Sequence, residues 1–149
     1  MENNQKRYVL IVTDLVIRAI ELELLEDLTA EQLLHAYRRI AARRSTPTFH
    51  VSDNAKQFEL LRDILLAQTI VKIKWKFIKE YAPWEGGAYE RLIAPVKGAI
   101  HRTFHGEALT ESMLRTVLAE IAATLNSRPL TYVSSDTEDH PLTPNHFLQ

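Results

Sequence analysis

Hydrophobic patterns typical of strands and of helices alternate along this chain, and that alternation constrains its fold more than any other feature. Runs of β-branched or alternating apolar residues predict strands over 8–13, 19–24, 48–51 and 70–77. Apolar residues at helical spacing predict helices over 29–44, around 58–65, over 89–105 and over 110–125. Helices interleaved with strands predict a mixed α/β sheet covered on both faces.

The length favours one domain over residues 1–149, because 149 residues can enclose a single core. No internal repeat or long linker divides the sequence. From about residue 127 onward the chain contains Pro129, Pro141 and Pro144, so we expect an irregular tail there.

Composition excludes several classes of protein. With 46% hydrophobic and 25% charged residues, the chain does not have the composition of a low-complexity disordered protein. Its sequence also contains no apolar run of the roughly 18 residues that a membrane span needs. No secretory signal is recognisable, so export is not expected. The absence of cysteine excludes a disulfide scaffold, a thiol nucleophile and a Cys-ligated zinc site.

The charges of the sequence give little information about a binding partner. The formal net charge is −1, which by itself indicates no polyanion. Between Glu90 and Glu107, however, there is no acidic residue, while Arg91, Lys97 and Arg102 all lie there. Such a cluster is usually a solvated helix face.

Acidic residues stand where predicted elements begin or end. Asp53 follows the third strand, where an Asp-Asn pair is more often a turn or helix cap than a ligand. Glu90 is placed in the first turn of a helix, directly after the expected hinge Gly86-Gly87. If the two carboxylates meet, they could hold Mg²⁺ with a substrate phosphate, which is a hypothesis of nuclease or transferase chemistry.

Four segments then carry a resemblance to a known family: residues 52–58 (SDNAKQF), 82–93 (APWEGGAYERLI), 125–130 (LNSRPL) and 141–148 (PLTPNHFL). They resemble the catalytic core of retroelement integrases, specifically the BEL/Pao-type branch of LTR retrotransposons. The resemblance implies an RNase H-like fold and a set of carboxylates that binds Mg²⁺ or Mn²⁺. It also implies DNA as a partner, together with a homodimer or higher homo-oligomer that pairs through the helices at 29–44 and 110–125.

The resemblance assigns roles to single residues. Asp53 corresponds to the second metal-binding Asp, and Glu90 corresponds to the catalytic Glu. Lys97 corresponds to a lysine that contacts the DNA end, although an exposed lysine without a role is the simpler interpretation. Asn54 and Gln57 become candidate DNA contacts, with capping of the next helix as the alternative for Asn54.

Other positions depart from the family or have simpler interpretations. Only two strands precede the first helix here, so we expect the family's first, central strand and its Asp to be absent. The strand at 8–13 would then correspond to the family's second strand, and Asp14 stands at its end. Gly86-Gly87 would form a mobile loop, and Pro95 is expected to kink the helix that contains Glu90. The remaining candidates are predicted to be surface or packing residues: His101, His105, Trp75 and Trp84.

The leading functional hypothesis is a fragment of an integrase catalytic core. Its parent would be a metal-dependent polynucleotidyl transferase that nicks 3′ ends and transfers strands during DNA integration. The fragment alone is expected to be inactive, so whether this chain is an enzyme stays open. The alternative is a catalytically dead, integrase-derived module for dimerisation or DNA binding. The resemblance implies a nuclear location or a cytoplasmic preintegration complex.

Overall fold

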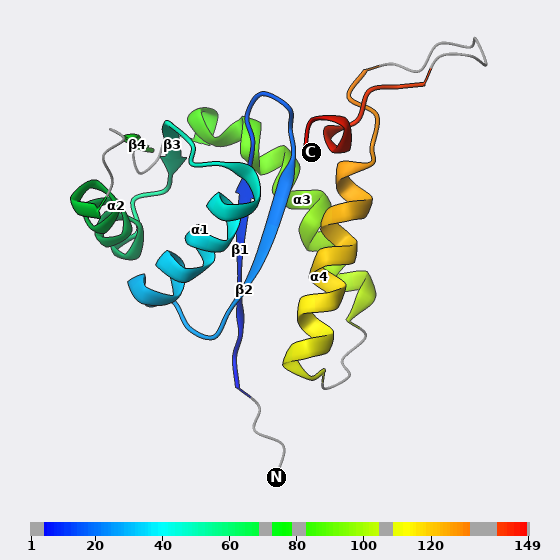
Figure 1. The fold of residues 1–149 in the computed structure, drawn as a ribbon. Coiled ribbons are helices and arrows are strands. Elements are labelled where there is room, and N and C mark those ends of the chain that lie inside the picture. The colour runs from blue at the N-terminus through cyan, green and yellow to red at the C-terminus, as the bar shows by residue number, and fades with distance from the viewer. Residues whose placement is uncertain (1–4, 69–72, 79–82, 105–108, 132–139, 149) are drawn as a thin grey trace. The chain divides into compact units, whose positions relative to one another are not determined.

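The structure is a computed structural model that describes residues 5–68, 73–78, 83–104, 109–131 and 140–148 (Figure 1). Strands and helices alternate along the chain, so the predicted mixed α/β class is confirmed. The elements are β1 (Tyr8–Thr13), β2 (Ile20–Leu25), α1 (Ala30–Arg44), β3 (Phe49–Ser52), α2 (Lys56–Gln68), β4 (Lys74–Phe77), α3 (Pro83–Thr103), α4 (Glu111–Asn126) and the 3₁₀-helix η1 (Pro144–Phe147). Among these described residues, no helix is long and apolar enough to cross a bilayer.

The described strands form two sheets of two strands each. β1 pairs with β2, and β3 pairs with β4. The β1–β2 hairpin is closed where the Asp14 N–H donates to the Ala19 carbonyl at 2.8 Å. β3 and β4 run parallel, with Phe49 opposite Lys74 and Ser52 opposite Phe77. The expectation that the family's central strand is absent stays a prediction.

The chain packs as two compact units, each built from two segments. The first unit comprises Met1–Leu10 and Leu24–Gly87, and the second comprises Ile11–Glu23 and Ala88–Gln149. The expectation of a single domain over residues 1–149 stays a prediction.

The core of the first unit lies mainly between α1 and α2, which lie side by side in Figure 1. Its buried members are Leu25, Leu33, Leu34, Ala36, Tyr37, Leu61, Leu65 and Ile73. α1 begins where predicted, because the Thr29 hydroxyl accepts a hydrogen bond from the Gln32 N–H at 3.3 Å. The Arg38 guanidinium also donates to the Gln68 side chain at 2.8 Å, which ties α1 to the end of α2.

A buried amide holds the second unit together. Asn126, the last residue of α4, is 3% exposed. Its Oδ1 accepts from the Ile20 N–H at 2.8 Å, and its Nδ2 donates to the Ile20 carbonyl at 2.9 Å. Arg128 adds bonds to the carbonyls of Leu125 and Arg18. The side chain of Asn126 thereby pairs with the edge of β2 as another strand's peptide group would.

α3 corrects two expectations about the glycine pair and the helix start. The helix begins at Pro83 and runs through Gly86 and Gly87, so the predicted mobile loop is helical here. Proline suits the first position of a helix, and each glycine costs only about 1 kcal/mol relative to alanine. A Cβ built at Gly87 would meet nothing within 4 Å, so no close contact requires glycine there.

The same helix also runs through Pro95 to Thr103 as one element. Pro95 is exposed and lies inside the helix, where it removes one backbone N–H, and the kink expected there stays a prediction. The predicted helix end beyond Thr103, at His105 and Gly106, lies outside the described residues.

Two further details of the fold differ from the sequence prediction. The alternation in β2 predicted a wet acidic face, yet Glu23 is 6% exposed and both faces of this strand are covered. The tail was expected to be irregular, but Thr143 precedes a turn of 3₁₀-helix with Pro144 at its first position. The His146 ring bonds the Thr143 N–H at 3.0 Å, which stabilises the start of that turn.

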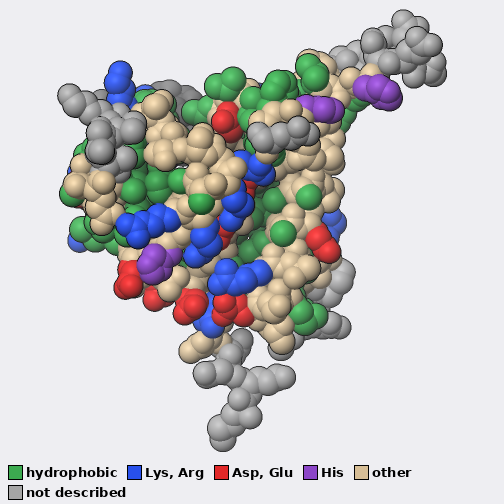
Figure 2. Space-filling model, viewed as in Figure 1, with side chains coloured by type: hydrophobic (Ala, Val, Ile, Leu, Met, Phe, Trp, Pro, Cys, Tyr) green, Lys and Arg blue, Asp and Glu red, His purple; other side chains and the backbone are tan. Residues whose placement is uncertain are grey.

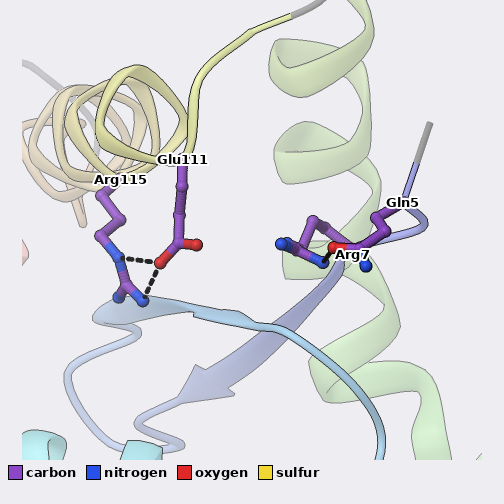
Figure 3. Close-up of polar contacts among 4 residues, drawn as sticks. All are labelled: Gln5, Arg7, Glu111 and Arg115. Atoms are coloured by element: carbon purple, nitrogen blue, oxygen red, sulfur yellow. Dashed lines mark hydrogen bonds and ion pairs between the residues drawn. The ribbon is translucent and has the colours of Figure 1, made fainter. Parts of the chain in front are cut away.

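α4 opens as predicted and carries an ion pair on its first turn. The Thr110 hydroxyl accepts from the Met113 N–H at 3.3 Å, which caps the helix. The Arg115 guanidinium donates to Glu111 Oε1 through Nε at 3.1 Å and Nη2 at 2.7 Å (Figure 3). The same view shows Arg7 bonded to Gln5 at 3.1 Å. Both pairs are exposed, so each contributes little to stability.

Candidate functional site

Asp53 lies where β3 ends, one residue beyond its last member Ser52. It is exposed, and its Oδ1 accepts from the Ala55 N–H at 3.2 Å. The Ala55 carbonyl in turn accepts the first hydrogen bonds of α2, from Phe58 at 2.9 Å and Glu59 at 3.3 Å. Within the described chain, Oδ2 of Asp53 accepts no hydrogen bond. One carboxylate oxygen therefore orders the turn, while the other remains available to a ligand.

An aromatic layer lies beside this turn on one face of β3 and β4. The His50 ring stacks on Trp75, with centroids 4.7 Å apart and planes 28° apart. His50 Nε2 lies 3.0 Å from the Tyr37 hydroxyl, and the Trp75 indole N–H donates to Ser52 Oγ at 2.9 Å. Trp75 is thus a packing residue, as predicted, and also a hydrogen-bond donor.

Burial shifts the titration of two groups in the aromatic layer. Desolvation lowers the pKa of His50 to about 4, because the imidazolium loses its hydration there. Desolvation also raises the pKa of Tyr37 above its ordinary value. At neutral pH the His50–Tyr37 pair is therefore uncharged, and its hydrogen bond joins two neutral groups.

Asn54 and Gln57 lie on either side of the start of α2, because the helix begins at Lys56. Asn54 is exposed and Gln57 is half-buried. The capping alternative for Asn54 is not observed, because the side chain that bonds a backbone N–H here is that of Asp53. In the described chain neither the Asn54 nor the Gln57 side chain forms a hydrogen bond, so their role as DNA contacts stays a prediction.

Glu90 and Lys97 belong to α3 in the second unit, and both are exposed. Glu90 is the eighth residue of the helix rather than part of its first turn, so the helix dipole does not account for it. Seven residues correspond to about two turns and about 10 Å, so the two side chains occupy one helix face. His101, four residues further along, is exposed as predicted, whereas His105 and the side chain of Trp84 lie outside the described residues.

The structure therefore groups the predicted site residues by unit. Asp53, Asn54 and Gln57 lie together in the first unit, and Glu90 and Lys97 lie together in the second. Among the described residues, no group of three or more His, Asp or Glu side chains could hold a metal ion. Asp14 is engaged in the hairpin turn, where its Oδ1 accepts from Val16 at 2.7 Å and Ile17 at 2.9 Å.

The surface carries both signs of charge. Blue and red side chains are interspersed on the face drawn in Figure 2, in keeping with the net charge of −1. Exposed hydrophobic side chains occur as well, and Leu142 and Phe147 near the C-terminus are each 51% exposed. The overall charge therefore indicates no particular attraction to a polyanion.

Sequence reasoning missed the hydrogen bonds that order this region. Trp75 and Ser52 are 23 positions apart, and Tyr37 and His50 are 13 apart. The only usable signal was general: an indole N–H in a partly buried position usually finds an acceptor. Which acceptor it finds depends on the register of two parallel strands, and the sequence does not specify that register.

Comparison with known proteins places the fold. No protein-family model matches the sequence, and no curated protein does. Among solved structures, one match is the dimeric form of the HTLV-2 integrase catalytic core domain in complex with magnesium, with a TM-score of 0.68 at 15% identity. This match covers 100% of this chain and 89% of that one. The catalytic core domain of BIV integrase matches with a TM-score of 0.67 at 17% identity, covering 94% and 84%.

A chain of the simian T-cell lymphotropic virus intasome, solved in complex with the PP2A regulatory subunit B56 gamma, matches with a TM-score of 0.74 at 13% identity. The match covers 98% of this chain and 49% of that one, so this chain spans about half the length of its counterpart. At these identities the likeness concerns the fold. The chain has the fold of a retroviral integrase catalytic core, which confirms the integrase-type architecture that the sequence resemblance implied.

Proposed function

We propose that this chain is a fragment of the catalytic core of a BEL/Pao-type retrotransposon integrase, whose parent protein acts in DNA integration. One observation carries the proposal: the fold agrees with integrase catalytic cores over nearly the full length of both chains. The parent protein would nick 3′ ends and transfer them to target DNA, in the nucleus or in a cytoplasmic preintegration complex.

Two carboxylates would bind the metal in this function. Mg²⁺ and Mn²⁺ prefer hard oxygen ligands, and the open Oδ2 of Asp53 and the exposed Glu90 carboxylate fit that requirement. A bound cation would supply Lewis-acid stabilisation of phosphoryl oxygens. The structure of the HTLV-2 core contains magnesium, which supports a divalent cation here. The proposal requires the carboxylates of Asp53 and Glu90 to bind the same metal centre.

DNA and further copies of the chain are the proposed partners. The Lys97 ammonium, on the same face of α3 as Glu90, would contact phosphates of a DNA end, and such contacts position a duplex without reading its sequence. Asn54 and Gln57 would contact DNA next to Asp53. The neighbours include an intasome and both dimeric and trimeric forms of a core domain, which supports self-association.

A second candidate function is a catalytically dead module that binds DNA or pairs with itself. The bonding of Asp14 favours it, because this carboxylate already accepts two backbone hydrogen bonds in the β1–β2 turn. A two-metal site needs more ligands than Asp53 and Glu90 alone provide.

Metal-dependent nicking of a DNA end separates the two functions. We expect no nicking by the 149-residue chain, and nicking in Mn²⁺ by a chain extended with an N-terminal strand that carries an Asp. In the extended chain, Glu90→Gln should abolish nicking because it removes a charged ligand while keeping the side-chain size. Glu120→Gln is the matched control, since Glu120 is an exposed residue of α4.

The outcome that would contradict the catalytic function is equally specific. Nicking that persists in Glu90→Gln at the rate of Glu120→Gln would show that Glu90 binds no essential metal. Nicking that is absent from the extended chain, with DNA binding retained, would favour the dead module.

A further inference from the structure

The turn that contains Asp53 is connected to β4 through a single side chain. The hydroxyl of Ser52 accepts the Trp75 indole N–H at 2.9 Å and donates to the Asp53 carbonyl at 2.9 Å. A serine hydroxyl has one proton and two lone pairs, so it can accept from the indole and donate its proton to the carbonyl at the same time. The three residues thus form a hydrogen-bonded relay, which we call the Trp75–Ser52–Asp53 relay.

The strand register makes this relay possible. Because side chains alternate across a strand, His50 and Ser52 share one face of β3, and Trp75 and Phe77 share the corresponding face of β4. The Ile78 N–H also donates to the Ser52 carbonyl at 2.9 Å. Ser52 is therefore held twice, at its carbonyl by Ile78, directly after β4, and at its hydroxyl by Trp75 of β4.

The Trp75 ring is itself fixed on both sides. It stacks on His50 at 4.7 Å and on Phe77 at 6.0 Å, with planes 28° and 27° apart. The Arg62 guanidinium lies 5.0 Å from the centroid of Phe77, and the Tyr37 hydroxyl bonds His50 at 3.0 Å. The indole N–H thus has a set direction, which is what a positioning contact requires.

At the other end of the relay, Asp53 is held at two atoms. Its carbonyl accepts from Ser52, and its Oδ1 accepts from the Ala55 N–H at 3.2 Å. The first bond fixes the peptide plane that follows Asp53, and the second fixes the carboxylate against that plane. The orientation of the remaining oxygen, Oδ2, is set by these two contacts together.

We propose that Trp75 and Ser52 are positioning residues that orient Oδ2 of Asp53 toward a divalent cation. The proposal rests on the proposed function, in which Asp53 is a metal ligand. Neither residue touches the cation. They act as outer partners of a ligand, a class of contact whose loss typically weakens metal affinity 10- to 100-fold.

Two single substitutions and their combination test the relay in the chain as it stands. Trp75→Phe keeps an aromatic ring on His50 and removes the N–H, and Ser52→Ala removes the hydroxyl. Amide hydrogen exchange of Ala55 reports on the turn without any metal. Paramagnetic broadening of the Asn54 and Ala55 amide signals by added Mn²⁺ reports on binding at Asp53.

We expect each single variant to accelerate Ala55 exchange and to raise the Mn²⁺ concentration needed for half-maximal broadening by about 10-fold. The double variant should behave like either single one, because both changes break the same relay. Thr29→Ala is the matched control: it removes a hydroxyl and one capping hydrogen bond at the start of α1, in the same unit but outside the aromatic layer, and should change neither readout.

The possible results are distinguishable. Trp75→Phe or Ser52→Ala matching Thr29→Ala in both readouts would overturn the relay, and so would full additivity in the double variant. Urea unfolding of every variant shows whether a general loss of stability explains the exchange data, in which case Thr29→Ala would change equally. If Asp53→Asn binds Mn²⁺ as the wild type does, Asp53 is no metal ligand, and the proposed function and the metal part of this proposal both fail.

Discussion

Replacement of Asn126 by alanine should destabilise the second unit more than any surface change. The Asn126 side chain is the partner of both the N–H and the carbonyl of Ile20, and Ile20 is 1% exposed. A buried backbone group that loses its hydrogen bond costs about 1–3 kcal/mol, so two such groups give about 2–6 kcal/mol. Against a usual total of about 5–15 kcal/mol, that loss is large.

Urea unfolding at 25 °C, followed by circular dichroism, measures the change. Asn126→Ala should lower the unfolding midpoint at nearly unchanged slope, because the surface exposed on unfolding hardly changes. Asn145→Ala, at an exposed asparagine in η1 of the same unit, is the matched control and should stay within about 0.5 kcal/mol of the wild type.

The isosteric substitution Asn126→Asp tests the same contact with Ile20. Asn126→Asp keeps an acceptor for the Ile20 N–H but places a carboxylate against the Ile20 carbonyl, so this variant should also be destabilised at pH 7. Protonation of the new carboxyl restores a donor, so its deficit relative to the wild type should shrink as the pH falls. An Asn126→Ala variant as stable as Asn145→Ala would refute the reasoning.

Other expectations follow from single contacts. Because the pKa of His50 is about 4 when folded and 6.5 when unfolded, the unfolded state binds this proton first as the pH falls. The free energy of unfolding should therefore fall by about 2 kcal/mol between pH 6.5 and 4, after allowance for the partial exposure of His50. In urea unfolding at a series of pH values, His50→Gln should lack this part of the pH dependence. Thr110→Ala should cost about 1 kcal/mol in thermal or urea unfolding, because α4 loses its N-cap. Lys97→Ala should reduce the salt dependence of binding to a DNA end by about one phosphate contact, whereas Lys74→Ala, on exposed β4, should not. Sedimentation at high micromolar concentration should show dimers or larger species, and monomer alone would contradict pairing through α1 and α4.

Local physics accounts for the elements that the sequence predicted well. Thr29 and Thr110 cap their helices as expected, because a hydroxyl at that position reaches a backbone N–H three residues ahead. β1 and β2 lie where apolar periodicity placed them. Asp53 follows β3 and forms a turn, which an Asp-Asn pair after a strand favours.

Local preference misled the prediction around α3. Glycine weakens a helix, so Gly86-Gly87 indicated a loop, yet the helix includes both residues. The alternation in β2 indicated a solvated acidic face, yet Glu23 is buried. The two glycines cost only about 2 kcal/mol together, which the hydrogen bonds of the remaining helix offset. Glu23 has a partner in the folded chain, which offsets the cost of burying its carboxylate.

By itself, the sequence determined the order of strands and helices, their caps and the carboxylates worth testing, because these depend on neighbours within one or two turns. Only the folded chain determined that Asn126 pairs with Ile20, 106 positions away, and that Trp75 reaches Ser52 across a parallel strand pair. Such contacts depend on register and packing between elements. Many sequences with the same periodicity could satisfy them in different ways, so periodicity alone could not select them.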